Sequence, residues 1–504
     1  MERILEAQSV NSGSQTAGSR RQRPAEKRPA RVMMIGCGPH ARRIYLPALR
    51  DLDSVELAAV VELDSTARET LEKVEQYFAN PQFVFTEPFA PAHVMPGELR
   101  DRLDHLVAML DINGVIITTE PLSHMAYSAW ASAKGLHLLM DKPISLYEDI
   151  SHSPASARQL LSDYSELARL RDGGKAFIVN AQRRYHPGFE VVKEAVEEIS
   201  GKYGIPITSM QNAHCDGQWR LPYEIVTQDY HPYNRGYGKL AHSGYHIVDV
   251  AAWLLSSSFS AARKTFDGIS AFTKFIFPDA LLHQQNRDDY LRVFGSEYET
   301  VNPYTDAELQ TEYAGYGEVD MSSVIGIQSG GTDIAGLTIN LSHNGFSRRN
   351  WILPGEDLYK GNGRVKHEYH NIEQGPYQNV QIHSYQSSDR HETLEGMGPA
   401  GQALGENNHF DIYIFRNSGV TGGKPLEVIR SGDFRKVGRE AASGLVTESV
   451  KHRVVQEFAE AIIGQRPVQE TASDLSSHAL TSALMSAIYE AGTTHSYITR
   501  KFTI

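Results

Sequence analysis

Residues 32–41 read Val-Met-Met-Ile-Gly-Cys-Gly-Pro-His-Ala, and this stretch decides the fold of the N-terminal part of the chain. Its apolar first half predicts a buried strand, and its glycines predict a tight turn into a helix. Gly36 permits the turn, Gly38 has no Cβ to keep a pyrophosphate from the backbone, and Ala41 lets the helix pack closely on the strand. The free N–H groups of a helix N-terminus attract phosphate. The dinucleotide-binding residues predicted here are Gly36, Gly38, Pro39, His40 and Ala41.

An acidic residue follows the second predicted strand. Residues 55–61 are mostly apolar and are followed by Glu62. In a dinucleotide fold, a carboxylate at this position hydrogen-bonds the ribose hydroxyls of adenosine. Because a carboxylate would repel a 2′-phosphate, the pattern favours NAD over NADP as the cofactor. Asp64 is an alternative for the same role, and a solvated acidic pair at a strand end is the structural alternative.

Length and composition limit the possible classes of protein. The 504 residues predict two domains, and the formal net charge of −12 argues against nucleic acid or an anionic membrane as the main partner. No apolar run approaches the roughly 20 residues that span a bilayer. The two cysteines, Cys37 and Cys215, provide neither a disulfide framework nor a cysteine-rich metal site. Residues 1–30 are polar and aperiodic, so we expect a disordered tail on a cytoplasmic protein.

Strands and helices alternate through the first third of the chain. We expect helices over 66–78 and 99–109 and strands over 114–119 and 137–140, which is typical of a doubly wound parallel sheet. Ligands of such sheets bind beyond the carboxyl ends of the strands. Glu62, Thr118, Thr119, Asp141 and Lys142 all follow predicted strands, so the sequence predicts one site that contains them.

An ordered series of motifs resembles the glucose–fructose oxidoreductase, inositol dehydrogenase and rhizopine-catabolism (Gfo/Idh/MocA) family. The series begins with Gly36-x-Gly38-x-x-Ala41, continues with Thr119 and His124, and reaches Asp141-Lys142-Pro143. It continues with Arg183-Arg184-Tyr185-His186-Pro187 and with residues 238–249, which contain His246 and Asp249. The resemblance covers most of residues 31–300 and 445–504. It implies an NAD(P)-binding Rossmann domain over 31–180, then a substrate and oligomerisation domain over 181–504 with a large, mostly antiparallel open sheet.

The resemblance also implies an activity. Most members oxidise a sugar or cyclitol hydroxyl, or reduce the ketone, with NAD(P), and no metal is predicted for this chain. Lys142 matches the lysine that hydrogen-bonds the reacting hydroxyl, and His246 matches the histidine that acts as general acid and base. Physical chemistry supports both roles, because a desolvated lysine has a lowered pKa and a histidine titrates near neutrality. The structural alternatives are a surface lysine and a buried helix histidine.

Two positions depart from the family pattern. His242 stands where inositol-dehydrogenase-like members have aspartate, so it assists the proton relay, binds an anionic substrate group, or joins His246 and Asp249 at a metal. The redox cofactor makes the metal the least favoured of these. Glu120 stands where the family usually has proline.

The resemblance extends to cofactor and substrate contacts. The cofactor residues it adds to the glycine turn and Glu62 are Thr118, Thr119, His124, Asp141 and Lys142. Substrate contacts are expected from the second domain, where Trp219 suits a sugar face and Arg220 suits an anion. The substrate residues are Arg184, Tyr185, Trp219, Arg220, Tyr245 and Asp249.

The C-terminal half predicts further sheet. A strand is expected over 207–211, followed by a loop from His214 to Arg220, and further strands over 323–327, 335–341, 380–385 and 410–415. Enlarged loops within 300–440 include Arg348, Arg349, Lys366, His367, Tyr369 and His370. Helices are expected over 445–463 and 474–491, with a final strand over 497–504. By analogy with the family, we expect a homodimer or homotetramer.

The sequence leaves three functions open. The favoured one is NAD-dependent hydride transfer to or from a sugar or cyclitol. The second is an NAD-dependent glycosidase that works by transient oxidation, elimination and reduction, with His242 as an extra base. The third is a non-catalytic NAD-binding sensor, against which Lys142 and His246 argue.

Overall fold

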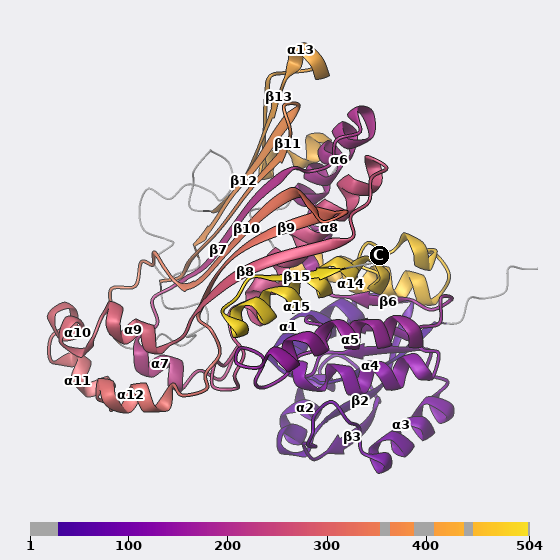
Figure 1. Cartoon of the computed structure of the whole chain (residues 1–504). Helices are drawn as coiled ribbons and strands as arrows, with labels where there is room; N and C mark the ends of the chain where they lie inside the picture. The colour runs from indigo at the N-terminus through magenta and orange to yellow at the C-terminus, as the bar shows by residue number, and fades with distance from the viewer. Residues whose placement is uncertain (1–28, 353–362, 388–407, 438–446, 502–504) are drawn as a thin grey trace, which may run out of the picture.

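A computed structural model describes residues 29–352, 363–387, 408–437 and 447–501 (Figure 1). Its N-terminal part is a six-stranded parallel sheet in the order β3-β2-β1-β4-β5-β6, which confirms the predicted doubly wound sheet. Almost all of the predicted tail, residues 1–28, lies outside the described residues. The strands are β1 (Ala30–Ile35), β2 (Val55–Leu63), β3 (Gln82–Thr86), β4 (Gly114–Ile117), β5 (His137–Met140) and β6 (Phe177–Val179).

Both faces of this sheet are buried. Successive side chains of a strand point to opposite faces, so each strand contributes to two apolar layers. Met33 and Ile35 pack into one apolar cluster with α3 and α4, whereas Val32 and Met34 pack into another with α1. The second cluster also contains Phe458 of α14 (Thr447–Ile462), so a helix from the far end of the chain covers part of the first sheet. The remaining helices are α1 (Pro39–Arg50), α2 (Ala67–Val74), α3 (Gly97–Leu110), α4 (His124–Ala133) and α5 (Pro154–Leu170).

The second sheet has nine strands in the order β14-β13-β12-β11-β7-β10-β9-β8-β15. The β7–β10 pair is parallel and the other pairs are antiparallel, as expected for a mostly antiparallel sheet. The strands are β7 (Ser209–Gln218), β8 (Gly268–Ile276), β9 (Asp320–Ser329), β10 (Thr332–Asn344), β11 (Val365–Gln374), β12 (Gln378–Ser387), β13 (Asn408–Arg416), β14 (Leu426–Arg430) and β15 (Ile498–Lys501).

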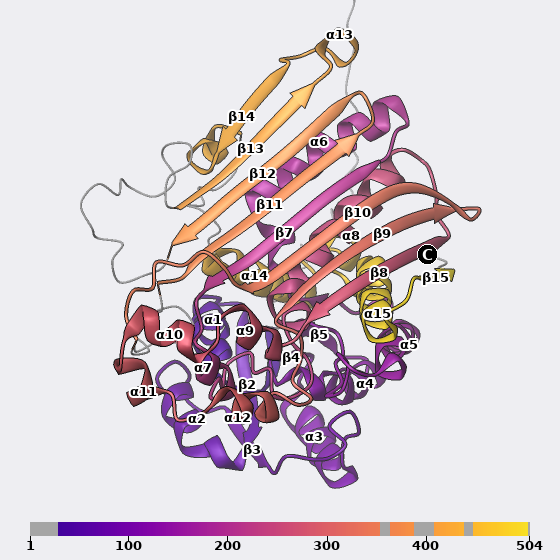
Figure 2. The same cartoon turned by 60° about the vertical axis from the view of Figure 1, so that its left-hand side comes forward.

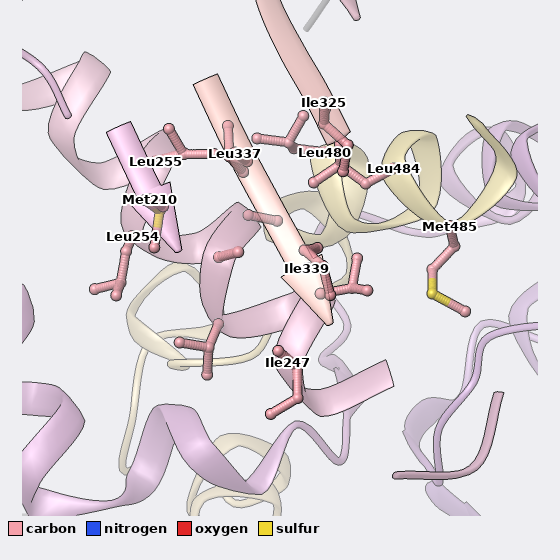
Figure 3. Close-up of a cluster of buried hydrophobic side chains, with 14 of the residues drawn as sticks. Met210, Ile247, Leu254, Leu255, Ile325, Leu337, Ile339, Leu480, Leu484 and Met485 are labelled. Atoms are coloured by element: carbon pink, nitrogen blue, oxygen red, sulfur yellow. The ribbon is translucent and has the colours of Figure 1, made fainter. Parts of the chain in front are cut away.

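Three long helices cover one face of this sheet: α6 (Pro187–Tyr203), α8 (Tyr245–Ala261) and α15 (Ala479–Thr494). Figure 2 shows the strands side by side with these helices behind them. The apolar core lies between the two layers, where Met210, Leu337 and Ile339 of the strands meet Leu254 of α8 and Leu484 of α15 (Figure 3). Burial of each such side chain contributes about 1.5–3 kcal/mol, which accounts for the close packing of the layers.

The structure corrects two expectations about the second sheet. Strand β7 runs to Gln218, so His214 and Asp216 lie in a strand rather than in a loop. Strand β11 contains Lys366 and His370, which were also expected in a loop. In both strands, polar residues occupy buried positions of the alternating pattern, and this hides the apolar periodicity that predicts a strand.

Short helices that the sequence analysis missed follow β7 and β8. Their segments pack into small clusters around Tyr233 and Tyr298. Among the helices of the described ranges, none is both long and apolar enough to span a membrane. The short helices after β7 and β8 are α7 (Pro222–Val226), α9 (Asp279–Gln284), α10 (Arg287–Phe294), α11 (Glu297–Val301) and α12 (Asp306–Glu312), and α13 (Ser418–Thr421) follows β13.

Candidate active site

The glycine turn after β1 has the geometry that a phosphate cradle needs. Gly36 has φ +89°, and a Cβ there would lie 2.7 Å from the backbone carbon of Thr118 and 2.7 Å from the backbone nitrogen of Thr119. A Cβ on Gly38 would meet no atom within 4 Å, and α1 begins directly afterwards at Pro39. The open space beside Gly38, at a helix N-terminus, fits a dinucleotide pyrophosphate.

Glu62 lies at the end of β2 and is held against this turn. Its Oε2 accepts a hydrogen bond from the backbone N–H of Cys37, and its Oε1 accepts one from the backbone N–H of Leu63 at 2.8 Å. Each oxygen keeps a further lone pair for a ribose hydroxyl. The side chain of Glu62 does not line the cavity described below.

Thr118 and Thr119 follow β4 at the same edge of the sheet. The backbone N–H of Thr118 donates to Ile35 O at 2.8 Å, and its Oγ1 donates to Gly36 O at 2.6 Å. His124 is fully buried behind them, where its Nδ1 lies 2.7 Å from Pro143 O and its Nε2 lies 3.2 Å from Thr119 O. His124 therefore joins the ends of β4 and β5 and does not line the cavity, although the sequence predicted a cofactor contact.

Asp141 follows β5 and is fixed by two neutral donors. Its Oδ1 accepts hydrogen bonds from Tyr45 Oη at 2.9 Å and from Asn180 Nδ2 at 2.8 Å, while its Oδ2 lies 3.7 Å from His40 Nε2. Burial opposes ionisation of this carboxyl, but His40, Lys451 and the two hydrogen bonds outweigh it and lower the pKa of Asp141. Asp141 is therefore a carboxylate at neutral pH.

Lys142 reaches from the end of β5 to the turn that precedes α8. Its Nζ donates to His242 O at 2.5 Å and to Ala241 O at 3.5 Å. Burial lowers the pKa of Lys142 to about 8, although the nearby carboxylate of Asp141 acts in the opposite direction. A lysine with such a pKa can donate a hydrogen bond or exchange a proton near neutral pH.

A π-helical turn, Leu240–Gly244, presents His242 beside this lysine. The turn is anchored where the backbone N–H of Leu240 donates to Oε1 of the buried Glu318 at 2.8 Å. The imidazole of His242 stacks on that of His231, with ring centroids 4.6 Å apart and planes 7° apart. Both ring nitrogens of His242 are buried without a hydrogen-bond partner in the described residues, and burial with nearby Lys142 lowers its pKa well below the usual value.

His246 lies in the first turn of α8. Its Nε2 is 3.3 Å from Gln182 Nε2, and its Nδ1 has no hydrogen-bond partner in the described part of the chain. Burial, followed by the charges of Arg183 and Lys142, lowers the pKa of His246 well below 6.5. The ring is therefore neutral at pH 7 and can accept a proton.

One cavity of about 450 Å³ connects these groups. It extends from the glycine turn of the first sheet to the polar ends of strands in the second sheet. Nine predicted site residues line it: Gly38, Pro39, His40, Thr118, Thr119, Asp141, Lys142, His242 and His246. Gly36, Ala41, Glu62 and His124 support this wall from behind without lining the cavity.

The six predicted substrate residues do not line the cavity. Arg184 is 1% exposed, and its Nε and Nη2 donate to the carboxylate of Asp249 at 2.9 and 2.7 Å. Tyr245 is buried 3.3 Å from His478 Nδ1, and Tyr185 donates to Glu457 Oε1 at 2.6 Å. These four residues thus form polar contacts within the core, because the segments that carry them pack against α14 and α15.

Trp219 and Arg220 are also placed away from the cavity. Trp219 packs on Phe294 with ring centroids 5.3 Å apart, and Arg220 is buried with its Nε donating to Gln218 Oε1 at 2.7 Å. Because Asp249 is held by Arg184, the hypothetical metal set of His242, His246 and Asp249 does not form. Within the described residues, no other group of three or more His, Cys, Asp or Glu side chains is arranged to hold a metal.

The structure brings in residues that the sequence analysis missed. Arg183 lines the cavity, whereas its neighbour Arg184 points into the core. Strands β11 and β12 supply Lys366 and Gln386, and Lys451 comes from α14. The local signal available here was a charged residue at every second position, Arg364, Lys366 and Glu368, which is typical of one face of a strand. Cavity-lining residues outside the predicted site set include Arg43, Glu120, Asn180, Gln182, Arg183, His231, Tyr237, Arg364, Lys366, Gln386 and Lys451.

Comparison with known proteins agrees with this geometry. Residues 30–167 match the model of the GFO_IDH_MocA oxidoreductase family, described as an NAD-binding Rossmann fold. Over this stretch the chain is similar to the Gfo/Idh/MocA oxidoreductases. The match confirms the resemblance that the motifs suggested and the NAD-binding character of the first sheet.

Similarity to solved structures extends over both sheets. The levoglucosan dehydrogenase in complex with NADH has a TM-score of 0.55 and 14% identity, and the alignment covers 94% of this chain and 99% of that chain. The WlbA dehydrogenase from Bordetella pertussis, in complex with NADH and UDP-GlcNAcA, has a TM-score of 0.55 and 13% identity over 95% of this chain and 100% of that chain. At such identities the likeness establishes the fold.

A curated relative is the inositol 2-dehydrogenase of Burkholderia multivorans. It is 23% identical over 239 residues, which represent 47% of this chain and 57% of the relative. The matched part of the chain thus spans little more than half the length of this relative.

The two glycines of the cradle provide a matched test of its role. We expect Gly36→Ala to lower the free energy of unfolding by about 2–4 kcal/mol. The new Cβ would collide with the backbone of Thr118 and Thr119, and the alanine would be held at a positive φ. Gly38→Ala should change it by less than about 1 kcal/mol but weaken NAD binding at least about tenfold, since its Cβ enters the space for the pyrophosphate. Urea denaturation and calorimetric titration with NAD measure the two effects. Unchanged NAD affinity in Gly38→Ala would contradict the cradle.

Proposed function

We propose that this protein is an NAD-dependent dehydrogenase that transfers hydride between a hydroxyl-bearing carbon of a sugar or cyclitol and nicotinamide. The observation that carries the proposal is the single cavity that joins the glycine cradle to Lys142 and His246. A dehydrogenase needs a cofactor site and a proton-transfer group within reach of the same carbon. The curated inositol 2-dehydrogenase relative supports the substrate class.

The chain provides residues for each part of the cofactor. The Gly36–Gly38 turn and the N-terminus of α1 would hold the pyrophosphate, and Glu62 would hold the adenosine ribose. Bound NAD supplies the nicotinamide carbon that accepts hydride. Thr118, Thr119 and Asp141 lie on the wall between the cradle and Lys142 and would orient the nicotinamide end.

NAD is the preferred cofactor in this proposal. The carboxylate of Glu62 beside the turn would repel a 2′-phosphate. Arg42, which follows the glycine turn, is occupied by an ion pair with Glu69 and by a 3.2 Å hydrogen bond to Thr70 Oγ1. NADP would therefore meet the carboxylate of Glu62 and, in Arg42, an arginine that is already paired.

Lys142 and His246 handle the proton. The ammonium of Lys142 would donate a hydrogen bond to the reacting oxygen and stabilise negative charge as hydride leaves. The neutral ring of His246 would accept the hydroxyl proton, because its pKa lies well below neutrality. His242 would assist through its backbone carbonyl oxygen, which accepts a hydrogen bond from Lys142 Nζ and so positions the ammonium.

This assignment predicts a pH profile. Lys142 is charged below its pKa of about 8 and loses its charge above it, so kcat/KM for alcohol oxidation should fall as pH rises through about 8. His246 becomes protonated only well below pH 6.5, so the acidic decline should begin below that value. Initial rates of NADH formation from pH 5 to 10 measure both limbs. A Lys142→Met variant that kept the alkaline limb would show that another group causes it.

The proposal also assigns the larger units. Residues 31–180 would bind the cofactor, and residues 181–504 would bind substrate and a second copy of the chain. The described part of the second sheet has an uncovered face that carries exposed Phe272 and Val324 on β8 and β9, which supports a homodimer or homotetramer.

The decisive experiment uses purified protein with NAD and a panel of sugars, cyclitols, polyols, sugar acids and aryl glycosides. Absorbance at 340 nm measures net NADH, and aglycone release is followed in the same samples. NADH formation establishes the dehydrogenase. Release of aglycone without net NADH would replace it with the redox glycosidase, and bound NAD with no turnover on any class would favour a sensor.

A further inference from the structure

Strands of the second sheet form one end of the cavity, and some polar side chains there have no hydrogen-bond partner among the described residues. Lys366 of β11 and Gln386 of β12 are opposite each other in the strand register, so their side chains point to the same face of the sheet. Both line the cavity. Within the described residues, neither side chain makes a hydrogen bond or an ion pair.

Arg183 adds a third unused donor. Its Nε donates to Glu368 Oε1 at 2.9 Å and its Nη2 donates to Glu368 Oε2, which fixes the plane of the guanidinium. Its Nη1 is buried and has no hydrogen-bond partner in the described structure, although the side chain lines the cavity and is only 2% exposed. An unsatisfied buried donor is destabilising, and a ligand that accepts a hydrogen bond from Nη1 would remove that penalty.

The charge of the cavity favours an anion. Six of its lining residues are lysine or arginine and three are aspartate or glutamate. Lys451, 3.4 Å from His40 Nε2, and Arg43 of α1 lie near the cofactor cradle and would face the pyrophosphate. The cations at the opposite end would remain for the substrate. These are Arg183, Arg364 and Lys366.

The environment of Lys366 differs from that of the other two. Arg183 is paired with Glu368, and Arg364 Nη2 donates to Asp216 Oδ1 at 3.1 Å. Burial, followed by Arg183 and Arg364, lowers the pKa of Lys366 to about 7. An anion bound at its Nζ would offset both effects and keep the ammonium charged.

We propose that the substrate is a sugar acid or another polyhydroxy carboxylic acid, whose carboxylate is bound by Lys366 Nζ, the Gln386 amide and Arg183 Nη1. One ammonium, one amide N–H and one guanidinium N–H match the acceptor capacity of two carboxylate oxygens. Lys142 and His246 in the same cavity would then act on a hydroxyl elsewhere on the polyol. This inference rests on the proposed function, since it names the substrate class of that site.

The test measures binding, which needs no turnover. Calorimetric titrations of the NAD-saturated protein compare glucitol, gluconate and glucitol 6-phosphate, which differ in a single terminal group, and glucose with glucuronate as a ring-shaped pair. We expect each carboxylate to bind at least about tenfold more tightly than its neutral partner, a difference of about 1.4 kcal/mol. Lys366→Met should abolish this preference, and Lys366→Arg should retain most of it. Lys264→Met, at an exposed lysine beyond α8, is the control and should change nothing.

Other binding results overturn the carboxylate site. Equal affinity for neutral and carboxylate compounds, or no binding of either carboxylate at high millimolar concentration, excludes a carboxylate site. Preferential binding of glucitol 6-phosphate replaces the carboxylate with a phosphate. A carboxylate preference that survives in Lys366→Met places the anion elsewhere. If carboxylates bind as expected but no compound yields NADH, the anion site stands and the dehydrogenase proposal fails.

Discussion

Lys142→Met should lower kcat/KM for NADH formation by about 10²- to 10⁴-fold, the range that a positioned acid–base group contributes. The variant keeps the length of the side chain but removes the ammonium, which is buried in the cavity and bonded to His242 O. NAD affinity should change by less than about threefold, because the cradle at Gly38 is untouched. Initial rates at saturating NAD and calorimetric NAD titration separate the two effects.

Lys264→Met, at an exposed position beyond α8, is the matched control and should retain full activity. Loss of NAD binding in Lys142→Met, in parallel with loss of rate, would assign Lys142 to cofactor binding alone. A variant with normal rates would remove Lys142 from the mechanism.

The second large effect is expected in stability. Asp249→Asn should lower the free energy of unfolding by about 3–5 kcal/mol, because it leaves the guanidinium of Arg184 buried without its counter-charge. Burial alone would raise the pKa of Asp249, but Arg184 and His478 outweigh it and hold the pKa well below the usual range. The stabilisation is therefore present at neutral pH and is lost as pH falls through the acidic range below about 4. Urea denaturation at pH 7 and at lower pH values measures it.

The double variant Arg184→Met with Asp249→Leu is the control, since it removes both charges together. It should recover most of the lost stability. Neither form should change KM for substrate in the folded fraction, because Arg184 and Asp249 lie outside the cavity. A raised KM with normal stability would instead support the substrate role that the sequence suggested.

Local sequence was sufficient for much of the first sheet. The predicted strand over 137–140 coincides with β5, and the glycine turn after Ile35 adopts the predicted strand–turn–helix. These signals are local, because an apolar strand and a turn that needs glycine are encoded by consecutive residues. Lys142 and His246 were predicted from the resemblance of the motifs that contain them, and the structure places both on the wall of the cavity.

The second sheet was harder to predict where its buried face is polar. Glu368 and His370 are nearly inaccessible, with His370 Nε2 2.9 Å from Glu368 Oε1, so β11 lacks the apolar alternation of an ordinary strand. The pairing partners of such residues come from distant segments. Arg183, for example, binds Glu368 across 185 positions of sequence.

The sequence by itself therefore determined the cofactor turn, the parallel sheet and the two residues proposed for proton transfer. Tertiary structure alone decided which neighbouring residues face the cavity. Arg183 and Arg184 are adjacent in a single 3₁₀ turn, yet one lines the cavity and the other pairs with Asp249 in the core. Their directions depend on how α8, α14 and β11 pack around that turn. The reason is physical: the burial and pairing of a charge depend on non-local contacts, which no local pattern encodes.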